Sequence, residues 1–110
     1  MLSESKEVEI LNIVEDLQEL CVGFLPDIMN SKTVNEDLEK QLYMHLTKLK
    51  ELIQDEKYIP REISGFLFSI YLIIASEAEH LKSPIENRPL FMLVAKLQVY
   101  LQDIFGKSKI

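Results

Sequence analysis

The side chains of this sequence best placed to do chemistry are Glu77 and His80, which lie three residues apart. At that spacing a carboxylate and an imidazole share one helix face, as in di-iron carboxylate bundles. Such a centre needs a second Glu-x-x-His pair, and here Leu42 stands three residues before His45. We therefore expect Glu77, Glu79 and His80 to form the solvated end of a helix, with Glu77 half-buried and paired with a lysine or arginine. A metal-dependent enzyme built on Glu77 and His80 is the alternative.

Other arrangements that support catalysis or cofactor binding are missing from the sequence. Cys21 is the single cysteine, so neither an internal disulfide nor a cysteine-based zinc set is possible, and it is expected as a small core side chain. The three glycines are far apart, which excludes a glycine-rich phosphate loop. No motif orients His45, expected at the edge of an apolar face, as a base. We expect no catalytic, cofactor-binding or metal-ligating residue, and thus a non-enzymatic protein.

The composition is that of one globular domain rich in helix. The chain has 110 residues, of which 47% are hydrophobic and 27% charged. Three glycines and four prolines are too few for the many turns of an all-β domain. Leucine, glutamate and lysine, all abundant here, are good helix formers. These features predict a single helical domain over residues 1–110.

Charge is unevenly spread along the chain, whose net charge is −6. Residues 1–56 carry thirteen acidic and five basic side chains, whereas residues 57–110 carry five and seven. The acidic half argues against nucleic-acid binding, which requires a basic face. The most hydrophobic run, residues 63–75, falls short of the roughly twenty residues that a membrane span needs. The N-terminus is acidic, unlike a signal peptide, so we expect a cytoplasmic protein that does not span a membrane.

Apolar residues recur every three or four positions in the first half of the chain, which predicts two amphipathic helices there. The first should run from about Ser3 or Ser5 to about Phe24, because Pro26 should end or kink it. Residues 27–30 would then form one further turn. The second should follow the N-cap Asn35 and run to about Gln54. The expected core stripes are Ile10, Val14, Leu17, Cys21 and Phe24, widened by Leu11, Ile13 and Leu20, and then Leu38, Leu42, Leu46, Leu49 and Ile53, with Leu52 beside them.

Two more helices are predicted in the second half. The third should run from about Pro60, which suits a first helical position, to Leu81. The fourth should run from about Arg88 or Pro89 to Phe105, with Gly106 just past its end. Short connections favour an all-α, antiparallel four-helix bundle with up-down-up-down topology. The expected core stripes are Ile63, Phe66, Leu67, Ile70, Ile74 and Ala78, and then Leu90, Val94, Leu97, Leu101 and Ile104.

The third helix has more apolar surface than one core face requires. Phe68, Leu72 and Ala75 form a second stripe roughly opposite the first, which is either covered by another helix or exposed to a partner. The tyrosines at 43, 58, 71 and 100 are expected at the rim of the bundle, with the ring inward and the hydroxyl outward. The candidate partner-binding residues are Phe68, Leu72, Ala75, Tyr71, Arg88, Lys96, Lys107 and Lys109.

Residues 38–106 resemble the immunity proteins that protect bacteria from pediocin-like (class IIa) bacteriocins. The resemblance lies in Leu46-x-x-Leu49, in the stretch from Ile63 through FLFSIYLIIAS to Ser76, in a lysine turn at Lys82, and in a helix with Leu93 and Leu97 that ends at Gly106. It implies a cytoplasmic four-helix protein without enzymatic activity. Its partner would be the mannose phosphotransferase permease that the bacteriocin uses as receptor, recognised by the C-terminal half.

A second hypothesis is a different small helical interaction protein. Phage or mobile-element inhibitors, antitoxins and dimeric adaptors share the size and the absence of catalytic motifs. The second stripe of the third helix would then bind a partner or a second copy of the chain, so that a homodimer is possible.

Overall fold

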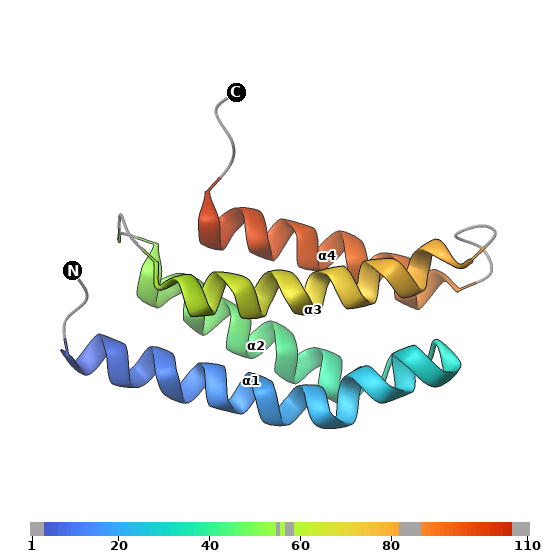
Figure 1. Ribbon diagram of the computed structural model, residues 1–110, viewed down its shortest axis with the longest axis horizontal. Helices are drawn as coiled ribbons and strands as arrows, with labels where there is room; N and C mark the ends of the chain where they lie inside the picture. The colour runs from blue at the N-terminus through green and yellow to red at the C-terminus, as the bar shows by residue number, and fades with distance from the viewer. Residues whose placement is uncertain (1–3, 55, 57–58, 82–86, 107–110) are drawn as a thin grey trace.

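The computed structural model describes residues 4–54, 56, 59–81 and 87–106, and within them the chain forms four helices and no strand. The helices are α1 (Glu4–Ser31), α2 (Glu36–Ile53), α3 (Arg61–Glu79) and α4 (Arg88–Phe105). Successive helices run in opposite directions (Figure 1). The predicted all-α, antiparallel four-helix bundle is therefore confirmed.

The helices are arranged as two hairpins packed side by side. α1 packs against α2 and, less extensively, against α3, while α4 packs against α3 and α2. The diagonal pairs, α1 with α4 and α2 with α3, make little contact. Helix α3 is therefore flanked by α1, which runs parallel to it, and by α4, which runs antiparallel (Figure 1). This neighbour order decides which side chains meet at the surface.

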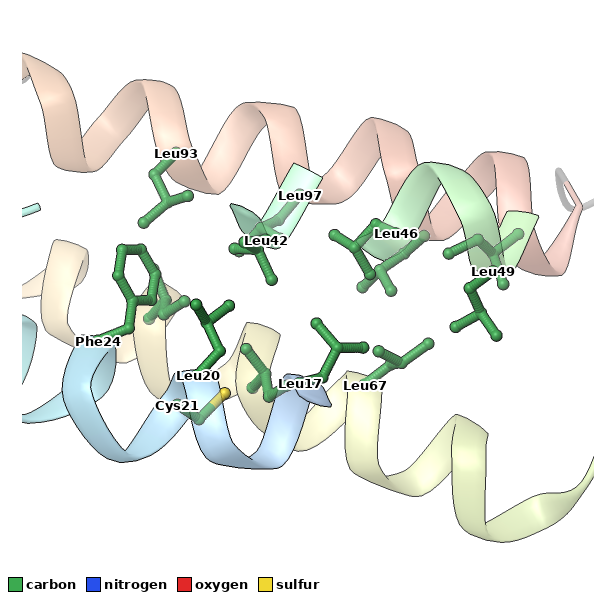
Figure 2. Packing of buried hydrophobic residues seen from close by; sticks show 14 of the residues in the cluster. Leu17, Leu20, Cys21, Phe24, Leu42, Leu46, Leu49, Leu67, Leu93 and Leu97 are labelled. Carbon is green, nitrogen blue, oxygen red and sulfur yellow. The ribbon is translucent and has the colours of Figure 1, made fainter. Parts of the chain in front are cut away.

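One continuous apolar cluster fills the centre, and no polar or charged side chain is buried in the described residues. Each helix contributes one stripe, at the three- and four-residue spacing of a buried helix face. Figure 2 shows side chains of α1 and α3 directed at those of α2 and α4 across the centre. The most deeply buried large side chains include Phe24, Ile10, Leu17, Ile28, Leu42, Leu46, Leu49, Ile53, Ile74, Leu90 and Leu93.

The predicted core stripes are correct except at their edges. Val14 and Val94 were predicted in the core but are half-buried, and Leu11, predicted to widen the first stripe with Ile13, is exposed. Ile13 is buried as predicted, and Leu93, which the predicted fourth stripe lacked, is also buried. Leu38 and Phe66 are also only half-buried, and they pack against the core from its edge. Each helix has two neighbours, so its buried arc is centred between them rather than on the most regular apolar spacing.

The predicted end of the first helix is wrong. α1 continues through Pro26 to Ser31, and its last turns rise at an angle to the rest of the helix (Figure 1). Ile28 in this extension is completely buried, and its burial offsets the hydrogen bond that proline removes. Lys32 follows the last helical residue, and its φ of 56° and its N–H, which donates to the Ile28 carbonyl at 2.9 Å, form an αL cap.

The other predicted helix boundaries agree with the structure within two residues. Asn35 caps α2 by accepting the N–H of Leu38 at 3.1 Å, as predicted. Pro60 is the residue before α3 rather than its first residue, and α3 ends at Glu79. Asn87 caps α4 and also donates to the Lys32 carbonyl at 2.6 Å, which ties α4 to the end of α1. Gly106 follows α4 with a φ of 82°, a conformation that favours glycine.

Phe24→Ala tests the position of the core. Phe24 is 0% exposed at the centre of the cluster, so the variant should lose about 3–5 kcal/mol of unfolding free energy through lost burial and a residual cavity. Urea denaturation followed by circular dichroism measures the loss. The control Val22→Ala, two residues earlier at a position that is 76% exposed, should change stability by less than about 0.5 kcal/mol. Equal losses in the two variants would contradict this core.

Candidate functional site

The second stripe of α3 is exposed at its centre. Phe68 is 45% exposed and Leu72 is 63% exposed, whereas Ala75 and Tyr71 are half-buried. The opposite face of α3 carries the core residues Ile63, Leu67, Ile70, Ile74 and Ala78. Among the described helices none covers Leu72, and Phe68 is covered only in part, by α4, so the apolar surface of α3 exceeds what its own fold buries.

Phe68 borders a groove between α3 and α4. Its ring stacks on that of Phe105 near the end of α4, with centroids 5.2 Å apart and planes 19° from parallel. The groove has a volume of about 230 Å³, and no charged side chain among the described residues lines it. Its apolar walls are flanked by amide side chains, which are neutral and can form hydrogen bonds with an uncharged ligand. The residues lining the groove are Phe68, Tyr71, Gln98, Leu101, Gln102, Phe105 and Gly106.

The predicted site residues do not all come together. Phe68 and Tyr71 line the α3–α4 groove, with Leu72 one turn beyond Phe68. Arg88 is exposed at the start of α4, roughly 25 Å along the helix from Phe105 at about 1.5 Å per residue. Lys96 lies on the other side of α4, facing α2. Lys107 and Lys109 lie outside the described residues. Within the described residues, the apolar part of the predicted surface gathers and the basic part does not.

A second groove, between α2 and α4, is formed by aromatic and charged side chains. Tyr43 and Tyr100 stack with centroids 5.3 Å apart, and the Lys96 ammonium lies 5.4 Å from the Tyr43 ring centroid. The Tyr43 hydroxyl donates to Glu39 at 2.6 Å. The pKa of Tyr43 is raised above its ordinary value, mainly by burial of the hydroxyl and to a lesser extent by the Glu39 carboxylate. The groove has a volume of about 580 Å³. Its two tyrosines already contact each other, and Tyr43 also contacts Lys96 and Glu39 within the fold.

Helix α1 carries exposed apolar residues on one side that were not among the predicted site residues. Leu11, Val22 and Met29 are 58%, 76% and 49% exposed. Their spacings of 11 and 7 residues place them on one side of a helix. The same spacings are visible in the sequence, but Leu11 was assigned to the core and the other two were not singled out.

The candidate catalytic and metal-ligating side chains stay apart. Glu77 is half-buried and paired with Lys32, as predicted. Glu79 and His80 are exposed at the end of α3, and His45 is half-buried on α2. Across residues 4–54, 56, 59–81 and 87–106, no three histidine, cysteine, aspartate or glutamate side chains lie close enough together to hold a metal ion.

Comparison with known proteins gives no match: no family model, curated sequence or solved structure is significantly similar to this chain. None of the helices in the described residues is long and apolar enough to cross a membrane.

Cys21 is buried in the core, as predicted, and burial raises the pKa of its thiol from about 9 to about 11. Only the thiolate is nucleophilic. At pH 9, iodoacetamide should therefore alkylate the native protein far more slowly than the protein in denaturant, as mass spectrometry can measure. Because the folded thiol keeps its proton between pH 9 and 11 while the unfolded thiol loses it, this group lowers stability as pH rises through that window. Equal alkylation rates in the two states would contradict a buried thiol.

Proposed function

We propose that this protein is a non-enzymatic binding protein whose α3–α4 groove receives an apolar, uncharged helix of a protein partner. The observation that carries the proposal is the exposure of Leu72 and Phe68 beside a groove that no charged side chain of residues 4–54, 56, 59–81 and 87–106 lines. Covering the exposed parts of these two side chains would contribute about 2 kcal/mol, roughly thirtyfold in Kd. Gln98 and Gln102 at the edge would orient the ligand through hydrogen bonds.

The kind of partner follows from the lining of the groove. A charged segment would lose its hydration at this surface and gain no opposite charge in return. An apolar segment has no such desolvation cost. Segments of this kind are common in membrane proteins near the bilayer and in the interfaces of helical assemblies. An apolar helix could place one or two large side chains between Phe68 and Leu101.

Among such binding proteins we favour an immunity protein against a pediocin-like bacteriocin. The resemblance over residues 38–106 includes both helices of the groove, and the antiparallel four-helix layout agrees with it. The protein would act from the cytoplasm on the mannose phosphotransferase permease that the bacteriocin has opened. The groove would bind an apolar segment that this complex exposes.

A different helical interaction protein is the second candidate, and the exposure of Leu72 is what favours it. An inhibitor, an antitoxin or an adaptor could use the same groove, and a homodimer could bury Leu72 against a second copy. Sedimentation velocity separates the dimer from the other forms. A monomer of 12.8 kDa at all concentrations excludes a stable homodimer.

Expression in a bacteriocin-sensitive strain tests the immunity function. We expect the wild-type protein to reduce killing by at least one member of a panel of pediocin-like peptides. Leu72→Lys should abolish protection, because a buried lysine without a partner charge disfavours the complex. The matched control is Met44→Lys on α2, where the replaced side chain is 47% exposed and distant from the groove; it should protect like the wild type.

Two results of that experiment would contradict the proposal. Unchanged killing by the whole panel, with the protein shown to be expressed and folded, would exclude the immunity function. Equal protection by Leu72→Lys and the wild type would exclude the α3–α4 groove as the binding surface. Circular dichroism melts of both variants show whether folding is retained, which is expected because both positions are exposed.

A further inference from the structure

The outer side of α1 carries an apolar stripe that the core does not use. We call the α1 stripe the set of Leu11, Val14, Val22, Leu25 and Met29, whose spacings of three, eight, three and four residues place them on one helix face, where the exposed Gln18 lies between Val14 and Val22. Val14 and Leu25 are half-buried and pack against the core. Leu11, Val22 and Met29 stand out from them into solvent. The stripe extends about 27 Å along the helix, at about 1.5 Å per residue.

The α1 stripe lies on the side of α1 that faces α3. At one end Leu11 lines a groove of about 320 Å³ together with Pro60 and Glu62. At the other end Lys32, just past α1, pairs with Glu77 of α3. Phe66 and Ile73 fall between Glu62 and Glu77 at helical spacing, so they share that side of α3 and broaden the apolar surface. Along the α1 stripe, α1 and α3 run side by side (Figure 1).

The surroundings of the α1 stripe are acidic. α1 carries seven acidic side chains and one basic one, Lys6, which pairs with Glu56. Glu7 and Glu62 edge the groove beside Leu11, and neither forms an ion pair within the described part of the chain. Glu4 and Glu15 are exposed on the outer flank of the stripe. The base at the far end, Lys32, is already paired with Glu77.

We propose that the α1 stripe is a docking surface for a basic amphipathic helix of a partner protein. The apolar face of such a helix would cover Leu11, Val22 and Met29, and its basic flanks would meet Glu7, Glu15 and Glu62. Apolar anchors on one helix face flanked by complementary charge are the usual basis of helix-in-groove recognition.

Charge favours this partner over two other ligands that could cover an apolar stripe, a second copy of the chain and a membrane surface. A second copy docked stripe to stripe would bring two acidic α1 helices together, and like charges at close range are unfavourable. A membrane surface carries anionic lipid in most cells and would repel the same carboxylates. The inference does not depend on the proposed function, because it uses a different groove and ligands of different charge.

Titration of the 15N-labelled full chain with a model helix tests the inference. The probe is a synthetic peptide of about 18 residues, five helical turns, with leucines on one face and lysines on the other. We expect chemical-shift changes at the backbone amides of the α1 stripe and at Phe66 and Ile73. A peptide with glutamate in place of every lysine should not bind. Affinity for the lysine peptide should fall as salt is raised from low to physiological concentration.

Variants identify the contact residues. Leu11→Ser combined with Val22→Ser should weaken binding about tenfold, because two exposed anchors are lost. Glu7→Gln combined with Glu62→Gln should weaken binding mainly at low salt. Leu72→Ser in the α3–α4 groove is the matched control and should change affinity by less than about twofold. Should the first double variant melt early, Val22→Ser alone keeps the test valid, since that residue is the most exposed of the stripe.

Three outcomes would overturn the inference. These are shift changes confined to the α3–α4 groove, equal binding of the glutamate and lysine peptides, and a homodimer that Val22→Ser dissociates. Each is separable from the proposed function: Leu72→Lys in the protection experiment reports on the α3–α4 groove, while the α1 variants in the titration report on the α1 stripe.

Discussion

The burial of one apolar stripe from each of four helices is the interaction on which the rest of this structure depends. In the described residues twenty-one buried side chains form a single cluster, and the three ion pairs lie outside it, two of them half-buried and one exposed. Ion pairs that water still reaches contribute little to stability, of order 1 kcal/mol or less each. Lys32 with Glu77, and Asn87 with the Lys32 carbonyl, position the helix ends. They do not replace the core, so the fold stands on its leucines and isoleucines.

Because the core uses one apolar stripe per helix, the apolar residues outside these stripes are not explained by the fold. Single exposed apolar residues are common in soluble proteins and need no explanation. Here five of the nine large exposed apolar side chains in the described residues fall into two groups, Phe68 and Leu72 beside the α3–α4 groove and Leu11, Val22 and Met29 along α1. Val8, Met44, Met92 and Val99 lie outside both groups. Replacing these residues by polar ones would not weaken the core, because none contributes a buried stripe. The two proposed surfaces would account for their apolar character.

The sequence predicted the helices and their core faces well, because both follow from local periodicity. Asn35 and Gly106 were recognised as boundary residues since a cap depends on a few neighbouring groups. The end of α1 was missed because Pro26 is a local signal against helix, whereas the burial of Ile28 that overrides it is a tertiary effect. Lys96 was wrongly predicted to share a surface with Phe68, again because a tertiary effect decides the outcome. Which side of α4 faces α2 depends on which helices pack beside α4, and the periodicity of the sequence does not encode that arrangement.

The neighbour order also explains why two surfaces of different chemistry adjoin one helix. α3 lies between α1 and α4, so its two flanks open onto different partners within the bundle. On the α4 side the described lining of the groove is apolar, aromatic and amide, with no charged group among the residues that the structure describes, and on the α1 side the groove is edged by Glu7 and Glu62. Each surface disfavours the ligand that suits the other, because an uncharged helix leaves the carboxylates uncompensated and a basic helix meets no acid beside Phe68. The two proposals therefore assign a different ligand to each flank of α3, and together they would account for an apolar content in α3 that one core face does not require.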